Sequence, residues 1–298
     1  MRRLIFAVVL TAFQTLPAAA QETPGRDLLM FPVGAMAEPQ SVSGMLGGGF
    51  WNPAMVAPDS AFRLRLGISA LNTPIDQGVS AQILAASGTL GRGWGAGITI
   101  AQAAITDLVR TESDPQTIGN ELAYNTTVLS IAAARRWRGV SIGGALRARS
   151  GQADQLHRSD VAMDVGVVIP RTLGTLVRLA ASTFLLSPQG KAREAAQYLA
   201  SADVPLARRD STLLLRGGIS ASHLQRRGSE VYPFATLDYR QLSLSGGLAR
   251  SSDHGISTSR ARLGLGVRYA RYTVGVAREE SGTALGASYQ FLLTSVFR

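Results

Sequence analysis

The most constraining feature of the sequence is a two-residue alternation that recurs from about residue 61 to the C-terminus. Segments of about ten residues place apolar side chains on one face and glycine, small polar residues or arginine on the other, with polar or glycine-rich breaks between them. In residues 262–269, for instance, leucine, valine and tyrosine alternate with arginine and glycine. The pattern is typical of transmembrane β-strands that face lipid on one side and a wet lumen on the other. A shift of one residue would turn every arginine toward hydrocarbon, so the register should be strongly specified.

We therefore predict an all-β fold, a transmembrane antiparallel up-and-down β-barrel of about fourteen strands. The candidate strands are 61–70, 79–89, 93–108, 121–137, 140–152, 155–169, 175–187, 192–206, 211–223, 229–240, 241–251, 255–270, 271–279 and 283–295. An even number lets such a barrel close with both ends on the periplasmic side. The eighth candidate is ambiguous, because residues 192–202 have a helix-favouring composition and either a strand or a short helix in a loop fits them.

The alternation also predicts which face of the wall individual side chains occupy. Leu179 and Leu185 are expected on the lipid face of the seventh candidate strand. Aromatic residues make up 6% of the chain, which is low for a barrel with full girdles at both membrane interfaces. Tyrosines nevertheless gather at strand ends in the second half of the chain, namely Tyr232, Tyr239, Tyr269, Tyr272 and Tyr289.

Composition agrees with strands that meet lipid on one side only. Hydrophobic residues are 46% of the chain, charged residues 17%, and the mean hydropathy is +0.12. A helical membrane protein would be far more apolar, and after the first twenty or so residues no segment approaches the length of a membrane helix. Cysteine is absent, which excludes a disulfide framework, thiolate chemistry and a cysteine metal site.

The N-terminus has the pattern of a secretory signal peptide over residues 1–20. Arg2 and Arg3 precede a short apolar run, and Ala18 to Ala20 form a small-residue cleavage site, so the mature chain is expected to begin at Gln21. A retained membrane helix is the alternative, but the apolar run is about ten residues where a span needs about twenty. We expect export, cleavage and insertion into the bacterial outer membrane, with its lipid and the barrel assembly machinery as partners. Phe297 near the C-terminus is typical of the signal that this machinery reads.

A motif precedes the first candidate strand. Gly47 to Gly49 are followed by Phe50-Trp51-Asn52-Pro53-Ala54. This stretch resembles the glycine-rich segment and Asn-Pro-Ala signature of the FadL-like outer-membrane transporters, particularly the PorV/PorQ branch. Residues 129–144, 161–166 and 203–206 resemble later parts of that branch. The resemblance implies a barrel of about fourteen strands with an N-terminal segment folded into the lumen, and either passage of hydrophobic compounds or an accessory role in secretion.

We accordingly expect residues 21–60 to form a plug or hatch and residues 61–298 to form the barrel. Proline stops strand pairing and asparagine can cap a turn, so Asn52 and Pro53 suit a hatch, although an ordinary tight turn before the first strand also fits. Phe50 and Trp51 could contact a ligand, or simply pack the plug against the wall.

Arginine is the most informative residue of the expected barrel. The strand pattern places eight arginines on the inner face, because a charge at mid-membrane on the lipid face costs about 2–4 kcal/mol. They are Arg63, Arg65, Arg147, Arg149, Arg178, Arg216, Arg262 and Arg268. Two interpretations remain open. The lumen could attract anions and hold the carboxylates of amphipathic ligands, or the arginines could pair with inward acids such as Asp164 and Asp238 and fill a narrow barrel.

The sequence does not favour an enzyme. The three histidines, His157, His223 and His254, fall at strand ends or in turns, and the neighbours Asp253 and His254 would point apart on an extended chain. The glycine repeat from Gly91 to Gly97 lacks the ending of a phosphate loop and lies within an alternating strand, where glycine allows curvature or close approach of the plug. We expect no cofactor and no metal. The basic residues form no contiguous patch, which argues against nucleic acid.

The function that the sequence favours is passage of small hydrophobic or amphipathic molecules, including anionic ones, through an outer-membrane barrel. The alternative is a non-conducting outer-membrane partner or anchor for secreted proteins. A barrel-embedded hydrolase is the least favoured possibility.

Overall fold

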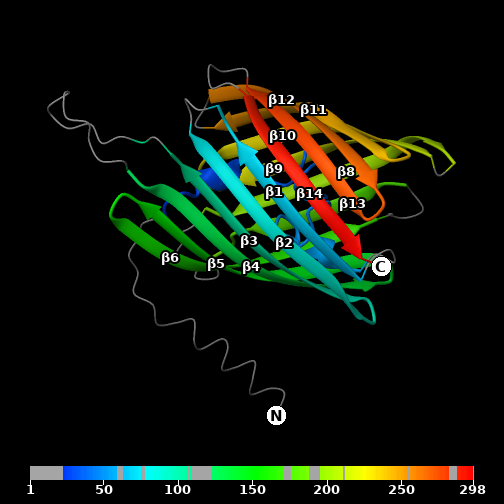
Figure 1. Ribbon diagram of the computed structural model, residues 1–298, viewed down its shortest axis with the longest axis horizontal. Helices are drawn as coiled ribbons and strands as arrows, with labels where there is room; N and C mark the ends of the chain where they lie inside the picture. Colours follow the sequence, from blue (N-terminus) through cyan, green and yellow to red (C-terminus); the bar gives the residue numbers. More distant parts are fainter. Residues whose placement is uncertain are drawn as a thin grey trace, which may run out of the picture.

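The computed structural model describes residues 23–58, 63–74, 78–106, 108, 122–170, 176–187, 195–210, 212–253, 256–281 and 287–297. In this part of the chain fourteen antiparallel strands form a closed barrel, in which each strand pairs with the next and β1 pairs with β14 (Figure 1). The strands are β1 (Leu64–Asn72), β2 (Val79–Gly91), β3 (Trp94–Ile105), β4 (Tyr124–Trp137), β5 (Val140–Ala153), β6 (Leu156–Ile169), β7 (Arg178–Phe184), β8 (Gln197–Arg209), β9 (Leu213–Leu224), β10 (Gly228–Tyr239), β11 (Leu242–Asp253), β12 (Ile256–Tyr269), β13 (Tyr272–Ser281) and β14 (Ala287–Phe297). The predicted fold class is confirmed. The ambiguous eighth segment is a strand.

Exposure alternates along the strands as the sequence pattern predicts. On β12, Leu263 and Leu265 are exposed on the outer face, whereas Arg262 and Gly264 are buried on the inner face. Outward leucine, isoleucine and valine side chains recur on most strands and give the barrel an apolar outer surface. No helix among the described residues is long and apolar enough to cross a membrane.

Two assignments from the sequence are wrong, one of Leu185 to the lipid face and one of Tyr232 to a strand end. Leu185 is buried instead of facing outward, because β7 ends at Phe184 and the backbone turns at Leu185 with a φ of 58°. Tyr232 is also buried: it lies on the inner face of β10, next to Phe234, and does not belong to an interfacial girdle. The period-two pattern fails past the end of a strand, and the position of an aromatic residue in the sequence does not say whether it faces lipid or the lumen.

The two ends of the barrel differ in their connections. At one end, which we call the turn end, most hairpins close through tight turns such as Arg92-Gly93 and Arg138-Gly139, whose residues have positive φ as type I′ turns require. The opposite end, the loop end, carries longer connections, including the one between Ile105 and Tyr124. The first strand begins and the last strand ends at the turn end, where the C-terminus is marked in Figure 1.

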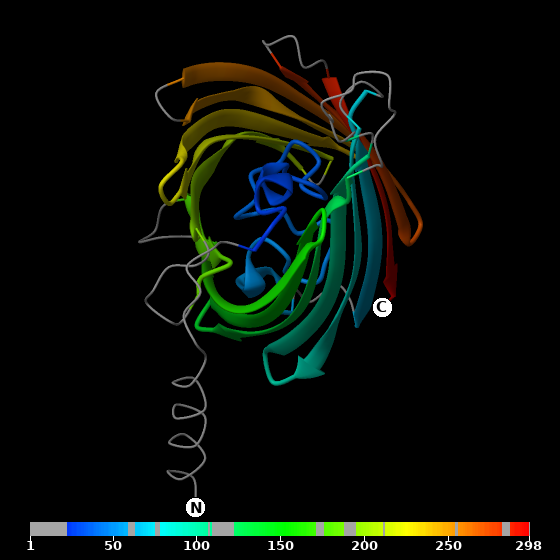
Figure 2. The ribbon, with the colours of Figure 1, turned by 90° about the vertical axis from the view of Figure 1, so that its left-hand side faces the viewer.

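Residues 23–58, which we call the lumenal segment, lie inside the barrel (Figure 2). The segment contains two short 3-10 helices, η1 (Asp27–Met30) and η2 (Pro53–Val56), and η2 packs against β4, β5 and β6. Inward glycines make room for it. A Cβ at Gly143 of β5 would lie 2.6 Å from the backbone nitrogen of Ala54, which is closer than real contacts allow. Glycine on the inner face of a strand therefore permits the close approach of the lumenal segment.

Candidate functional site

The motif at residues 50–54 lies against the inner wall of the barrel. Phe50 and Trp51 form an aromatic cluster with Phe184 of β7, with ring centroids 4.7 to 5.2 Å apart. All three side chains are buried, and the indole nitrogen of Trp51 donates to the carbonyl of Val33 at 2.9 Å. These aromatic residues pack the lumenal segment against the wall, and their burial leaves them no surface for a ligand.

The Asn-Pro pair shapes the backbone of the lumenal segment. The side-chain oxygen of Asn52 accepts a hydrogen bond from the backbone nitrogen of Ala54 at 2.9 Å, and its side-chain nitrogen donates to the carbonyl of Ser41 at 2.7 Å. Pro53 occupies the first position of η2, where a missing N–H costs nothing. Asn52 thus caps η2 and also joins two parts of the lumenal segment.

Arg147 of β5 contacts both the wall and the lumenal segment. Its guanidinium lies 5.0 Å from the ring centroid of Phe50 and 4.6 Å from that of Phe184. It also forms an ion pair with Asp164 of β6 and donates to the carbonyl of Phe50. Because both members of the ion pair are buried, this arginine holds the lumenal segment and does not face open solvent.

Arg149, two residues further along β5, anchors the start of the lumenal segment. It donates to the carbonyl of Pro24 at 2.7 Å, to that of Thr23, and to the hydroxyl of Thr126 at 3.1 Å. Successive inward residues on a strand are two apart. Arg147 and Arg149 therefore bind separate parts of the lumenal segment, near Phe50 and near Pro24, from the same strand.

Three more of the eight arginines are paired with acids on the inner face. Arg178 bonds Asp203 at 2.7 Å, and Arg216 bonds Asp238 at 3.1 Å. Arg262 contacts both Glu230 and Glu279, and Arg260 binds the same two carboxylates. The pairings with Asp164 and Asp238 that the sequence suggested are therefore present, and Asp203 and the two glutamates extend them.

The remaining three arginines lie toward the turn end. Arg63 is exposed just before β1, Arg65 is partly buried on β1, and Arg268 is exposed near the end of β12. Arg65 donates to the carbonyl of Gly44 in the lumenal segment. Within the described chain no carboxylate lies at ion-pair distance from Arg268. Arg65 and Arg268 thus differ from Arg147 and Arg149, because they border open space.

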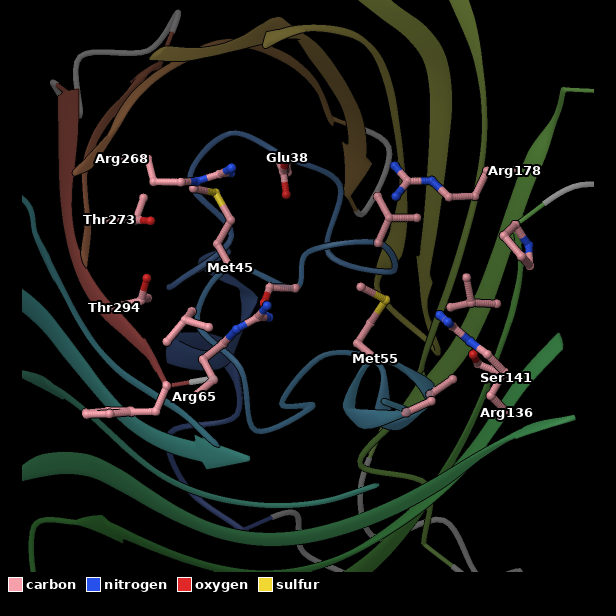
Figure 3. Close-up of a pocket in the computed structure, with 18 of the residues that line it drawn as sticks. Glu38, Met45, Met55, Arg65, Arg136, Ser141, Arg178, Arg268, Thr273 and Thr294 are labelled. Carbon is pink, nitrogen blue, oxygen red and sulfur yellow. The ribbon is translucent and has the colours of Figure 1, made fainter. Parts of the chain in front are cut away.

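That open space is a cavity of about 1010 Å³ between the lumenal segment and the barrel wall at the turn end. The lumenal segment forms its floor with apolar side chains that include Met45 and Met55 (Figure 3). Among the described residues, five arginines and one acid, Glu38, line it. The arginines are Arg65, Arg136, Arg178, Arg268 and Arg271. Because Arg178 is paired with Asp203 and Glu38 is acidic, the described lining keeps a net positive charge, beside a flexible apolar surface.

Glu38 opposes the charge of these arginines only in part. Its side chain is half-buried, and burial raises the pKa of the carboxyl above its ordinary value of 4.5, while Arg216 and Arg178 act to lower it. A carboxyl with a raised pKa is neutral over a wider acidic range. The net charge of the cavity therefore becomes more positive as the pH falls.

Sequence reasoning found Arg65, Arg178 and Arg268 but missed the other residues of the cavity. Arg136 and Arg271 sit at strand ends, where the alternation gives no direction, and Glu38, Met45 and Met55 belong to a segment without a periodic pattern. A tally of the arginines at hairpin turns would have found the two strand-end residues. No sequence signal would have found the other three.

The histidines stand apart from the cavity. His157 contacts the hydroxyl of Ser150 at 3.1 Å, His223 contacts that of Ser229 at 2.9 Å, and His254 lies outside the described residues. The described part of the chain contains no cluster of residues that could hold a metal ion. The expected signal peptide and its cleavage site also lie outside the described residues.

The barrel is similar in fold to solved channel structures. A CymD monoaromatic hydrocarbon channel is 10% identical and matches with a TM-score of 0.58 over 89% of this chain and 98% of that one. A TodX deltaS2S3 mutant monoaromatic hydrocarbon channel is 11% identical, with a TM-score of 0.55 over 82% and 91%. A Pseudomonas aeruginosa FadL homologue is 12% identical, with a TM-score of 0.54 over 94% and 99%. The chain therefore has a FadL-like barrel fold.

No protein-family model and no curated protein sequence matches the chain. The PorV/PorQ branch that the motifs suggested remains a prediction.

Proposed function

We propose that the chain is an outer-membrane channel for small hydrophobic or amphipathic molecules, and that the turn-end cavity holds an amphipathic anion on its way through. The main support for the proposal is the lining of this cavity, in which five arginines lie beside methionine and other apolar side chains. The FadL-like fold supports it, since the similar structures include channels for monoaromatic hydrocarbons.

The barrel surface supports this location. An outer face of leucine, isoleucine and valine favours contact with lipid, and bacterial single-chain barrels place short turns in the periplasm and longer loops outside the cell. The turn end, and with it the cavity, would then face the periplasm. Signal-peptide cleavage before Gln21 and delivery to the barrel assembly machinery belong to the same proposal.

The chemistry of the cavity suits a molecule with two unlike parts. An anionic head can form charge-assisted hydrogen bonds with Arg65 and Arg268, and guanidinium binds carboxylate or sulfonate through two parallel bonds. The apolar part can pack against Met45 and Met55, whose flexible side chains adapt to different shapes. Arg147 and Arg149 would instead keep the lumenal segment in place as a plug, because both are buried beneath it.

Two measurements test the proposal, uptake into liposomes and binding of the same anion. We expect the mature chain in liposomes to admit a decyl sulfonate faster than protein-free liposomes do, and the Arg65→Gln, Arg268→Gln double variant to bind it at least about tenfold more weakly, since a hydrogen bond to a charged group contributes about 1.5–3 kcal/mol. Arg250→Gln, at an exposed position near the loop end of β11, is the matched control and should behave as the wild type does. Equal binding by the double variant would refute the role of the cavity.

The alternative, a non-conducting partner for exported proteins, makes a different prediction. Such a protein would co-purify with secreted cargo and leave the permeability of liposomes unchanged. Hydrolysis of an ester or peptide by the purified chain, without uptake, would instead favour the enzyme interpretation.

A further inference from the structure

Four arginines at the turn end each lie over an outward-facing aromatic ring; one of them, Arg271, also borders the turn-end cavity and donates a hydrogen bond to the hydroxyl of Tyr272. We call these the rim pairs: Arg135 with Trp94 at 5.5 Å, Arg138 with Trp137 at 5.0 Å, Arg240 with Tyr239 at 5.4 Å, and Arg271 with Tyr272 at 5.0 Å, measured from the guanidinium carbon to the ring centroid. The four rings are between 41% and 57% exposed, and the four arginines are exposed as well. A guanidinium stacked on an aromatic face keeps its donors free for another ligand.

The rim pairs are distributed around the barrel. One pair lies at the β3–β4 ladder, where Trp94 and Arg135 are register partners, and the others lie at the tight turns that follow β4, β10 and β12. The turn between β2 and β3 adds the exposed Arg92. Hairpins at the turn end thus repeat one arrangement, an outward aromatic ring at the level of a strand end with an arginine above it.

The four rim arginines have no acidic partner among the described residues. None of them forms an ion pair with a carboxylate in the part of the chain that the structure describes. Arginines at the loop end differ: Arg260 bonds Glu230 and Glu279, and Arg278 bonds Glu280 at 2.8 Å while it lies over the ring of Tyr289. The same stacking therefore occurs at both ends, but among the described residues the stacked Arg278 at the loop end has a counter-charge and the four stacked arginines at the turn end have none.

We propose that the rim pairs form a belt that binds anionic phospholipid. Tyrosine and tryptophan concentrate at the level of the lipid headgroups, where their rings meet the upper acyl chains and their polar edges meet water. Arginine directly above such a ring would reach the phosphate and bind it through two parallel hydrogen bonds. A headgroup with net negative charge, such as phosphatidylglycerol, would be preferred over a zwitterionic one with the same phosphate. This inference rests on the membrane insertion of the proposed function and not on its cargo.

Tryptophan fluorescence provides a direct test, because two of the chain's three tryptophans, Trp94 and Trp137, belong to the rim pairs and the third, Trp51, is buried in the lumen. The full mature chain is inserted into phosphatidylcholine vesicles that contain a minority of either brominated phosphatidylglycerol or brominated phosphatidylcholine. Bromine quenches only nearby indoles, so Trp51 contributes a constant background. We expect stronger quenching by brominated phosphatidylglycerol, and loss of the difference at high salt as charges are screened.

Substitution of the rim arginines distinguishes an effect of their charge from an effect of their packing on the lipid preference. Arg135→Gln with Arg138→Gln should reduce the preference for phosphatidylglycerol by roughly fivefold per arginine at low salt, while quenching by brominated phosphatidylcholine stays unchanged because both tryptophans remain at the rim. The double lysine variant keeps the charge but loses the planar fork, and should retain an intermediate preference. Arg278→Gln, which alters a stacked but neutralised arginine at the loop end, is the matched control and should change nothing.

Equal quenching of the wild type by the two brominated lipids would overturn the proposal, and so would an undiminished preference in the double glutamine variant. Circular dichroism of each variant shows whether the barrel has inserted, so a folding failure is recognised as such. A chain that shows the lipid preference but admits no amphiphile would refute only the proposed channel function, and the reverse result would refute only the belt.

Discussion

Arg147 on β5 and Asp164 on β6 form an ion pair whose side chains are both 0% exposed. The pair lies where the wall of the barrel meets the lumenal segment, since the same guanidinium donates to the carbonyl of Phe50. A buried ion pair contributes little by itself, because desolvation offsets the Coulomb attraction, but removal of one partner leaves a buried charge without compensation. The stability of the contact between the barrel wall and the lumenal segment is therefore sensitive to substitution of either member of the pair.

Arg147→Met should destabilise the folded barrel by about 3–5 kcal/mol, since Asp164 would remain buried and unpaired. The double variant Arg147→Met with Asp164→Leu should recover most of this loss. Urea unfolding of the chain in lipid vesicles measures both. As a control, Asp238→Asn breaks the more exposed pair with Arg216, whose side chains are 21% and 38% exposed, and should cost less than about 1 kcal/mol. Equal costs at the two pairs would contradict the role assigned to burial.

Gly143 and Gly144 are adjacent on β5 and face opposite sides of the wall. A Cβ at Gly143 would collide with the backbone of Pro53 and Ala54, whereas one at Gly144 would meet its nearest described atom, the carbonyl oxygen of Asp164, at an ordinary 3.7 Å. Gly143→Ala should therefore loosen the lumenal segment at a cost of about 1–3 kcal/mol, the usual cost of overpacking.

Iodide quenching of Trp51 fluorescence, in a Trp94→Phe, Trp137→Phe background, reports on this loosening. Quenching should rise in Gly143→Ala and stay at the parent level in Gly144→Ala. A rise of the same size in both variants would mean that the lumenal segment is not held by its close approach to the wall.

Glu38 should make binding in the turn-end cavity pH-dependent. Because burial raises the pKa of this carboxyl above 4.5, it loses its negative charge as the pH falls through the raised value, and the cavity becomes more positive. Affinity for decyl sulfonate, which stays ionised throughout, should then increase by about fivefold, which corresponds to roughly 1 kcal/mol for one unit charge in a lumen of intermediate dielectric. Titration calorimetry from neutral to mildly acidic pH measures the increase.

Glu38→Gln is the control for this pH dependence, since it should bind the sulfonate tightly at every pH in the range. The same raised pKa has a consequence for stability. Below pH 4.5 the carboxyl is protonated whether or not the chain is folded, and stability falls as the pH rises from 4.5 to the raised value, because the unfolded state releases its proton first. A wild-type affinity that does not change with pH would contradict the assignment of Glu38 to the cavity.

Tyr232 of β10 holds the lumenal segment at a part of the wall that is separate from β5. Its hydroxyl donates to the carbonyl of Ala37 at 2.7 Å, and the guanidinium of Arg262 lies 5.0 Å from its ring centroid. Tyr232→Phe should cost about 1–3 kcal/mol, because the carbonyl of Ala37 is left without a partner. Tyr239→Phe, at an exposed ring on the same strand, should stay within about 0.5 kcal/mol of the wild type in the same urea experiment.

The approximate strand number, the two faces of the strands and the inward direction of most of the eight named arginines were predictable from the sequence. Alternation such as Leu263 and Leu265 against Arg262 and Gly264 has one physical solution when one face meets lipid, because every other register exposes charge to hydrocarbon. The prediction failed at Leu185 and Tyr232. There the strand ended or an aromatic residue faced the lumen, and local periodicity contains neither fact.

Only the tertiary structure decided which arginines hold the lumenal segment and which border the cavity. Arg147 and Arg268 have the same place in the two-residue pattern, yet one is buried against Phe50 and Asp164 and the other faces open space. The difference arises from contacts between residues far apart in the chain, such as Pro53 with Gly143, that form only once the barrel has closed around residues 23–58. Periodicity records which face of a strand a side chain occupies, but what it meets there depends on the whole fold.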